Sequence, residues 1–157
     1  MSESPLVSVT VCVRDGEHWV EDCLNSLLQQ THRPLEIIAV NDGSSDDTKS
    51  KLDTWHEKHS GGEVPIHIIH QDSLGLSAGR MAAVEQSKGM WIAITDIDVR
   101  PEPDWIEQML LACKPIDNES IAAVTGRTVF QAHDDVVSRF RAVEIASKYR
   151  NRPRRTS

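Results

Sequence analysis

The sequence has no stretch that approaches the ~20 consecutive apolar residues needed by a membrane-spanning helix. Its first residues, Met1 to Pro5, are polar and acidic, and they lack the charged start and apolar run of a signal peptide. The sequence therefore predicts a cytoplasmic protein. We expect a full-length protein to meet the inner face of a membrane only through a region outside this chain.

Cysteine is scarce, and positive charge is not in excess. The three cysteines, Cys12, Cys23 and Cys113, are far apart and odd in number, so they indicate neither a disulfide framework nor a CxxC redox or zinc site. Cys12 and Cys113 lie in apolar or amphipathic runs, and we expect both to pack in the core. The formal net charge of −7 argues against a general polyanion-binding surface, and hence against a nucleic-acid partner.

What is present is the composition of one globular domain: 157 residues, of which 39% are hydrophobic and 26% charged. Apolar, β-branched runs alternate with segments whose apolar residues recur at helical spacing. The predicted strands are residues 6–13, 35–40, 66–69, 90–95 and 121–130, and the predicted helices are residues 17–30, 49–60, 75–88, 105–110 and 134–149. This alternation predicts βαβ units and a three-layer α/β/α sandwich around a mostly parallel sheet.

Two observations support these assignments. Val20, Leu24, Leu27 and Leu28 form one apolar stripe, as on an amphipathic helix. Asp104, followed three residues later by Glu107, resembles a capping box at the start of a helix.

The histidines and tryptophans favour structural roles over a site. His67 and His70 are three apart on a predicted strand, so they point to opposite faces and cannot share a metal. His56 and His59 are better interpreted as part of a solvated helix face. The four tryptophans are expected to be packing anchors: Trp19, Trp55, Trp91 and Trp105.

Polar residues follow three of the predicted strands: Arg14-Asp15-Gly16, Asn41-Asp42-Gly43 and Asp96-Ile97-Asp98. In an open α/β sheet, ligands bind outside the carboxyl ends of the strands. Acids gathered there repel one another unless a cation or ligand N–H groups lie between them. The pair Asp96 and Asp98 suits a hard cation such as Mg²⁺ or Mn²⁺, although a DxD alone is also compatible with solvated carboxylates in a turn.

The order of four motifs is more specific than any one of them. VSVTVCVRDGEHWVEDCLNSLLQQT is followed by PLEIIAVNDGSSDDT, GLSAGRMAA and ITDIDVRPEPDW. This order resembles family 2 glycosyltransferases of the GT-A fold, from Val7 to Phe130. The resemblance implies a nucleotide-sugar-binding domain, transfer of a sugar from a nucleotide-diphosphate donor to an acceptor hydroxyl, and inversion as the usual outcome.

The resemblance also implies roles at the base end of the site. Asp42 matches the carboxylate that accepts a hydrogen bond from the imide N–H of the base, usually uracil, so a UDP-sugar is the expected partner. Val13 and Arg14 match the residues that line the base pocket. Gly43 is expected to let the backbone lie close to the ligand.

At the diphosphate end, Arg80 matches the basic residue that faces the phosphates. Asp98 matches the direct ligand of Mn²⁺ or Mg²⁺, and Asp96 matches the acid that lies near the ribose and reaches the metal through solvent. Two residues depart from the family pattern: Met81 stands where Asn is usual, and Asn41 replaces a common acid.

The resemblance leaves the catalytic base unassigned, because the family's base usually lies downstream of the DxD in a segment without a counterpart here. We therefore expect residues 1–157 to be one donor-binding domain, truncated at its C-terminus, with the base beyond Ser157. Such a fragment would bind donor but transfer little sugar.

Other classes of protein fit parts of this pattern. One is a non-catalytic nucleotide-sugar-binding module. Another is a phosphotransferase of the haloacid dehalogenase type, but Asp96-Ile97-Asp98-Val99 follows the fourth strand instead of the first, and Arg100 does not fit its motif. A receiver-like signalling module needs its acid pair after the first strand. A dinucleotide-binding domain is disfavoured because GLSAGR is not GxGxxG and does not follow the first strand.

Overall fold

The computed structural model describes residues 4–113, 122–126 and 129. The chain forms two compact units, residues 1–107 and 108–157. The first unit contains four strands and three complete helices. In chain order these are β1 (Val7–Val13), α1 (Val20–Leu28), β2 (Leu35–Asp42), α2 (Thr48–His59), β3 (Ile66–Gln71), α3 (Leu76–Gln86) and β4 (Trp91–Asp96). A last helix, α4 (Trp105–Ala112), begins at the end of this unit.

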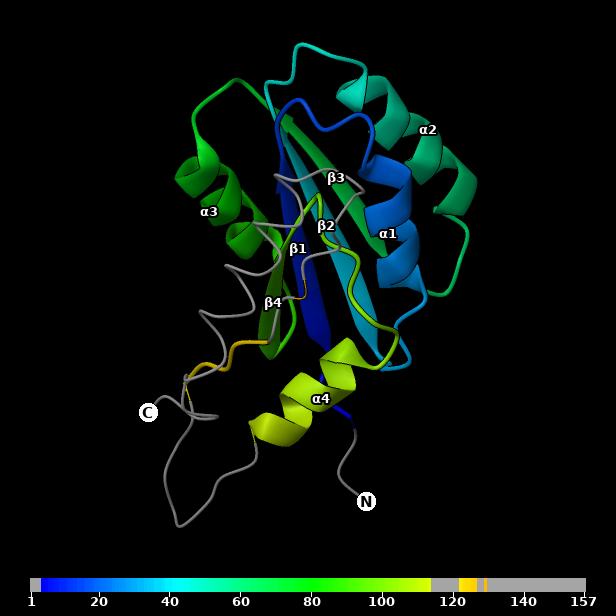
Figure 1. The fold of residues 1–157 in the computed structure, drawn as a ribbon, viewed down its shortest axis with the longest axis vertical. Helices are drawn as coiled ribbons and strands as arrows, with labels where there is room; N and C mark the ends of the chain where they lie inside the picture. The colour runs from blue at the N-terminus through cyan, green and yellow to red at the C-terminus, as the bar shows by residue number, and fades with distance from the viewer. Residues whose placement is uncertain (1–3, 114–121, 127–128, 130–157) are drawn as a thin grey trace, which may run out of the picture. The chain divides into compact units, whose positions relative to one another are not determined.

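The four strands form one parallel sheet in the order β3-β2-β1-β4. Helices α1 and α2 lie on one face, and α3 lies on the other, against β1 and β2 (Figure 1). This arrangement confirms the predicted α/β fold with a parallel sheet. The strand order reverses between β1 and β4, and α/β folds bind ligands at such a reversal.

The core is formed mainly by β1 and β2, which lie between the two helical layers. All eight residues of β2 are buried, as expected for an apolar strand covered on both faces. Val20, Leu24 and Leu27 of the predicted stripe belong to α1 and are fully buried. Trp55 is also buried, whereas Trp19 is 42% exposed, so the expectation that Trp19 is a packing anchor was wrong. Trp19 directly precedes α1, outside its buried stripe.

Three strands end later than predicted: β2 and β3 by two residues each, and β4 by one, which makes Asp96 its last residue. Asn41 and Asp42 were assigned to the loop of residues 41–48, but they end β2 because they pair with His70 and Gln71 of β3. Polar side chains weaken the strand signal in the sequence, whereas backbone pairing does not depend on side-chain polarity. Asn41 and Asp42 are therefore held rigidly by the sheet.

Buried polar groups tie the opposite end of the sheet together. The Ser8 hydroxyl donates to Glu36 Oε1 over 2.5 Å, and the Lys88 N–H donates to the same oxygen over 2.7 Å. The Gly89 N–H donates to Ser8 Oγ over 2.7 Å. These bonds fix the turn between α3 and β4, which lies at the amino ends of the strands.

Gln30 stabilises the segment that leads into α4. Its Nε2 donates to the Glu102 carbonyl over 2.7 Å, and its Oε1 accepts the Ile106 N–H over 3.1 Å. Gln30 is only 2% exposed, so its amide satisfies backbone groups that water would otherwise bind. No pattern in the sequence indicates this long-range contact.

In the second unit, the Cys113 N–H donates to the carbonyls of Met109 and Leu110 at the end of α4. Of the strand predicted at residues 121–130, the structure describes only residues 122–126 and 129, and these form no strand. The helix predicted at 134–149 lies outside the described residues. Within the described part of the chain, no helix has the length and apolar character to cross a membrane. The expected cytoplasmic location stays a prediction.

Candidate functional site

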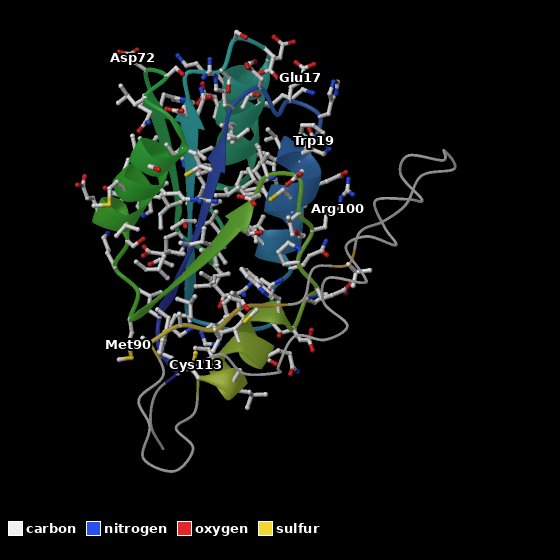
Figure 2. The ribbon with its side chains drawn as sticks, turned by 60° about the vertical axis from the view of Figure 1, so that its left-hand side comes forward. Glu17, Trp19, Asp72, Met90, Arg100 and Cys113 are labelled. Carbon is white, nitrogen blue, oxygen red and sulfur yellow. The ribbon has the colours of Figure 1, made fainter. Side chains whose placement is uncertain are left out.

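The polar residues singled out in the sequence come together at the carboxyl ends of the parallel strands. In the register of the sheet, Cys12 of β1 lies between Val40 and Asp96, and Val13 lies beside Asn41. The loop residues Glu17 and Asp72 lie at this same end of the molecule, and Met90 lies at the other (Figure 2). The expectation that the strand ends share one edge is therefore confirmed.

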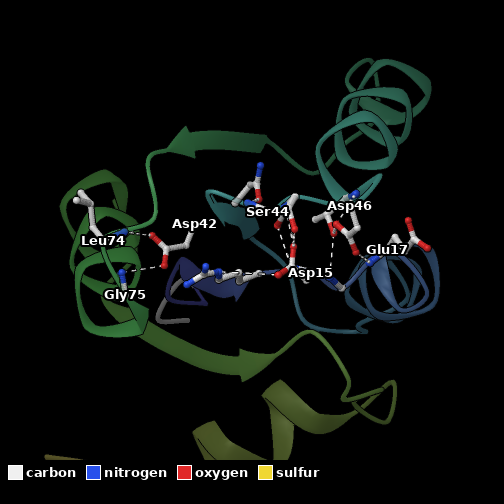
Figure 3. Close-up of polar contacts among 12 residues, drawn as sticks. Asp15, Glu17, Asp42, Ser44, Asp46, Leu74 and Gly75 are labelled. Atoms are coloured by element: carbon white, nitrogen blue, oxygen red, sulfur yellow. Dashed lines mark hydrogen bonds and ion pairs between the residues drawn. The ribbon is translucent and has the colours of Figure 1, made fainter.

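Asp42 accepts three hydrogen bonds at this edge (Figure 3). Its Oδ1 accepts hydrogen bonds from Gln71 Nε2 over 2.7 Å and from the Leu74 N–H over 2.8 Å. Its Oδ2 accepts the Gly75 N–H over 2.9 Å. The Leu74 and Gln71 bonds, together with the nearby charge of Arg14, hold the pKa of Asp42 below its ordinary value despite burial. Asp42 is therefore ionised near neutral pH and acts only as an acceptor.

Gly43 follows Asp42 in a left-handed conformation with φ +63°. A Cβ at this position would lie 2.5 Å from the backbone nitrogen of Ser73. A side chain here would collide with the loop that follows β3, and the expected closeness of Gly43 to a ligand stays a prediction. The glycine lets that loop approach, and the same loop supplies the N–H groups bound by Asp42.

The loops after β1 and β2 are joined by reciprocal hydrogen bonds (Figure 3). Asp15 donates its N–H to Ser44 Oγ over 3.0 Å, and its Oδ1 accepts the Ser45 N–H over 2.7 Å. The Ser45 bonds hold the pKa of Asp15 below its ordinary value. Asp46 Oδ2 accepts the Glu17 N–H over 3.1 Å. Arg14 thus extends from a loop that its neighbours hold in place.

Arg80 and Asp96 form an ion pair in which Nη2 and Oδ1 are 3.2 Å apart. Arg80 lies in the second turn of α3, and Gly79 before it packs close to the Cys12 sulfur. Burial raises the pKa of the Cys12 thiol, and the charges of Arg80, Asp42 and Asp96 act on the same thiol. Cys12, which pairs with Asp96 in the register of the sheet, therefore lies near three of the charged residues that the sequence singled out.

Asp98 lies two residues beyond the end of β4 and is exposed. Its carboxylate makes no hydrogen bond or ion pair with the described residues. No group of three or more His, Cys, Asp or Glu side chains is arranged to hold a metal within the described ranges. Two exposed carboxylates nevertheless fit a hard cation that takes its other oxygens from water and substrate phosphates, as Mg²⁺ commonly does.

The structure thus brings together Arg14, Asp42, Arg80 and Asp96, while Val13 is only 3% exposed and can offer a ligand little beyond its backbone. Sequence reasoning missed Gln71, Leu74 and Gly75. Gln71 could have been found at the third strand's carboxyl end if that strand had been extended by two residues. The backbone donors of Leu74 and Gly75 leave no such signal.

Comparison with known proteins gives a family match over most of the chain. The family model described as "Glycosyl transferase family 2" matches residues 8–156. The putative glycosyltransferase EpsH of Bacillus subtilis (strain 168) is 40% identical over 108 residues, covering 69% of this chain and 30% of the relative. The glucosyl-dolichyl phosphate glucuronosyltransferase of Haloferax volcanii is 30% identical over 127 residues, covering 78% of this chain and 38% of the relative. The chain thus spans about a third of each of these two relatives.

Solved structures show the same fold. The mannosyltransferase PcManGT from Pyrobaculum calidifontis, in complex with GDP-Man and Mn²⁺, aligns with a TM-score of 0.64 and 24% identity, covering 69% of this chain and 32% of that protein. TarS 1-349 of S. aureus, in complex with UDP-GlcNAc, aligns with a TM-score of 0.58 and 19% identity, covering 80% and 38% respectively. Both are GT-A glycosyltransferases, which confirms the expected fold class.

Proposed function

Because the chain belongs to glycosyl transferase family 2, we propose that it binds a nucleoside diphosphate sugar at the carboxyl ends of β1, β2 and β4. The full protein then transfers the sugar to an acceptor hydroxyl, with inversion. The observation that carries this proposal is that Asp42 and Asp96 end β2 and β4 on either side of β1, where the strand order reverses, and that Arg80 pairs with Asp96. The structural relatives support it, since one is in complex with UDP-GlcNAc and another with GDP-Man and Mn²⁺.

Within this proposal, the base is uracil and not guanine. A carboxylate oxygen has two lone-pair sites, and those of Asp42 Oδ1 are taken by Gln71 and Leu74. Among the described residues, Oδ2 accepts a hydrogen bond only from the Gly75 N–H, so one of its lone-pair sites is left. Uracil presents a single N–H between two carbonyls, whereas guanine presents adjacent N–H and NH₂ donors that need two acceptors. Asp42 is also only 4% exposed, which fits one edge-on contact better than two.

The diphosphate lies, in our proposal, beside Arg80, whose side chain is 41% exposed. Asp98 and Asp96 would hold Mn²⁺ or Mg²⁺, and the cation when bound supplies positive charge against the charge that develops on the leaving diphosphate. The ion pair with Asp96 orients the Arg80 guanidinium toward the edge of the sheet. The Arg80 side chain is therefore already oriented for the phosphates before the nucleotide binds.

Calorimetric titration with UDP and GDP, each with Mn²⁺ or with EDTA, tests the proposal. We expect UDP to bind more tightly than GDP, and the binding to weaken in EDTA. Equal UDP affinity in EDTA would exclude the metal, and preference for GDP would exclude the assigned base contact. Absence of any nucleotide binding would overturn the proposed function itself.

The variant Asp42→Asn tests the base contact, with Asp72→Asn as a matched control. Asp72 is an exposed carboxylate at the same edge of the sheet. The introduced amide places a donor where Gly75 or Leu74 also donates, so we expect UDP affinity to fall roughly tenfold to a hundredfold. The control should bind UDP as the parent does. A complex in which the base lies far from Asp42 would refute the assignment.

A further inference from the structure

One of the two residues that depart from the family pattern, Asn41, has a specific partner. In the register of the sheet, Asn41 of β2 lies beside His70 of β3, and their Nδ2 and Nδ1 atoms are 3.2 Å apart. The other ring nitrogen, His70 Nε2, lies 2.8 Å from Asp53 Oδ1 of α2. The Oδ1 of Asn41 lies 3.2 Å from the Ser44 backbone nitrogen. A chain of hydrogen bonds therefore runs from α2 through β3 and β2 into the turn after β2.

The direction of every bond in this chain follows from its two ends. The Ser44 N–H can only donate, so the oxygen of the Asn41 amide faces Ser44 and its NH₂ faces His70. His70 Nδ1 must then accept, which requires a neutral imidazole with its hydrogen on Nε2. That hydrogen points to Asp53, an acceptor. One tautomer and one amide orientation thus satisfy all four groups.

We infer that His70 is a positioning residue for nucleotide binding, acting through Asn41. This inference rests on the proposed function. The turn from Asn41 to Ser44 carries Asp42, and Ser44 Oγ accepts the Asp15 N–H of the loop after β1. By fixing the Asn41 amide, neutral His70 holds the turn that presents Asp42 and supports the adjoining loop.

The inference gives nucleotide binding a dependence on pH. Protonation of His70 places an N–H on Nδ1, opposite the NH₂ of Asn41, so either that bond or the Ser44 bond is lost. The charged group that faces His70 from α2 is Asp53, and the β2 side chain that contacts it is the neutral amide of Asn41, with Asp42 the next residue of that strand. The remaining charged residues nearby in the chain are Lys49 and Glu57, one turn to either side of Asp53, and Asp72, two residues after His70. We therefore expect UDP affinity to fall on acidification.

Titration of the 157-residue chain with UDP and Mn²⁺ at about pH 8 and about pH 6, where histidine changes charge, tests this dependence. We expect the affinity of the parent to fall at least about threefold at the lower pH. His70→Leu removes the acceptor and should weaken binding about fivefold to tenfold at pH 8. His70→Asn places a carbonyl oxygen near the former Nδ1, so it should restore binding to within about twofold and lose the pH dependence. The ionisation of UDP is the same in all experiments. A difference between variants in the pH dependence of UDP affinity is therefore due to His70.

Two controls make the outcome decisive. His67→Asn removes a histidine of the same strand that pairs with Glu36 instead, and it should keep the pH dependence of the parent. Asp53→Asn keeps an oxygen that can accept the Nε2–H of His70, so it should bind UDP as the parent does at about pH 8. If His70→Leu binds as the parent does, or if His70→Asn keeps the parental pH dependence, the inference is wrong. Should His70→Leu fail to fold, the His70→Asn profile decides.

The imidazole nitrogen shifts of His70, measured by NMR without nucleotide, separate this inference from the proposed function. The Nε2–H tautomer at about pH 8 supports the hydrogen-bond chain. The Nδ1–H tautomer would overturn it even if UDP binds. If the tautomer is as assigned but no nucleotide binds, the proposed function fails while the hydrogen-bond chain stands.

Discussion

Gly43 and Ser73 lie in backbone contact, although 30 positions separate them in the sequence (73 − 43). A Cβ on Gly43 would lie 2.5 Å from the Ser73 nitrogen and 2.9 Å from its Cα. The contact brings the loop after β3 against the end of β2, where Leu74 and Gly75 donate to Asp42. The glycine is thus required by a neighbouring loop as well as by its own φ of +63°.

Gly43→Ala should therefore destabilise the fold and disturb the Asp42 contacts. The left-handed conformation alone costs a non-glycine residue about 1–2 kcal/mol, and displacement of Ser73 adds to it. Gly61→Ala is the matched control, because a Cβ there meets nothing within 4 Å, and its effect should stay within about 0.5 kcal/mol. Urea unfolding monitored by circular dichroism measures both. Equal unfolding free energies for the two variants would contradict the tight contact.

Asp98→Ala should remove the Mn²⁺ dependence of UDP binding, whereas Asp96→Ala should weaken it less. Asp98 is exposed and makes no bond to the described residues, so its carboxylate is available to a cation. Asp96 already pairs with Arg80, so its carboxylate is less available to a cation than that of Asp98. Calorimetry with and without EDTA separates the two effects. Parental, metal-dependent binding by both variants would show that these acids are only part of a turn.

Acid should destabilise the loops around the site. Hydrogen bonds from Ser45 lower the pKa of Asp15, and bonds from Leu74 and Gln71 lower that of Asp42. Burial acts to raise the pKa of Asp46, but the bonds from Thr48 and Glu17 outweigh it. A carboxyl group with a depressed folded-state pKa contributes stability above its unfolded value, about 3.9. That contribution is lost as pH falls through the folded value.

Urea unfolding at about pH 7, 5 and 3 measures this loss, which should occur mainly below about pH 5. Asp15→Asn should show a shallower decline, because one of the three carboxylates no longer titrates. If the unfolding free energy of the parent were the same at the lowest pH as at neutral pH, these carboxylates would not stabilise the fold.

Cys23 should resist alkylation in the native protein. Burial raises the pKa of its thiol to about 12, helped by the charge of Asp98 and opposed by that of Arg100. At about pH 8 the thiol is almost wholly protonated, and the residue is fully buried. Iodoacetamide followed by peptide mass spectrometry should label the partly exposed Cys113 and Cys12 first, and should label Cys23 only in urea.

The same raised pKa predicts an alkaline loss of stability. The contribution of protonated Cys23 is complete below the unfolded pKa, about 8.5, and is lost as pH rises through the folded value of about 12. Cys23→Ala removes this titration. Its unfolding free energy should therefore depend less on pH in that range than the parent's, and an unchanged dependence would contradict the assignment.

The sequence by itself determined the order of elements and the edge at which the site lies. Apolar runs such as Val7–Val13 and the stripe beneath α1 depend only on neighbours along the chain, so their periodicity is visible without a structure. Parallel strands have their carboxyl ends at one edge, so the predicted parallel sheet places Asp42 and Asp96 at that edge. Only the strand order β3-β2-β1-β4 brings them to either side of β1. The four-motif resemblance indicated the family, which the match over residues 8–156 confirms.

The tertiary structure alone decided what those residues contact. The bonds of Asp42 to the loop after β3, of Gln30 to the start of α4, and of Asn41 to His70 join residues about 29 to 76 positions apart. Such contacts depend on where the crossover helices place each loop, and no local period encodes that placement. Polar strand ends are also ambiguous in sequence, because backbone pairing with β3 makes Asn41 and Asp42 part of the sheet. The sequence therefore identified which carboxylates are candidates for the site. The long-range arrangement of the backbone decided which of their lone pairs stay open to a ligand.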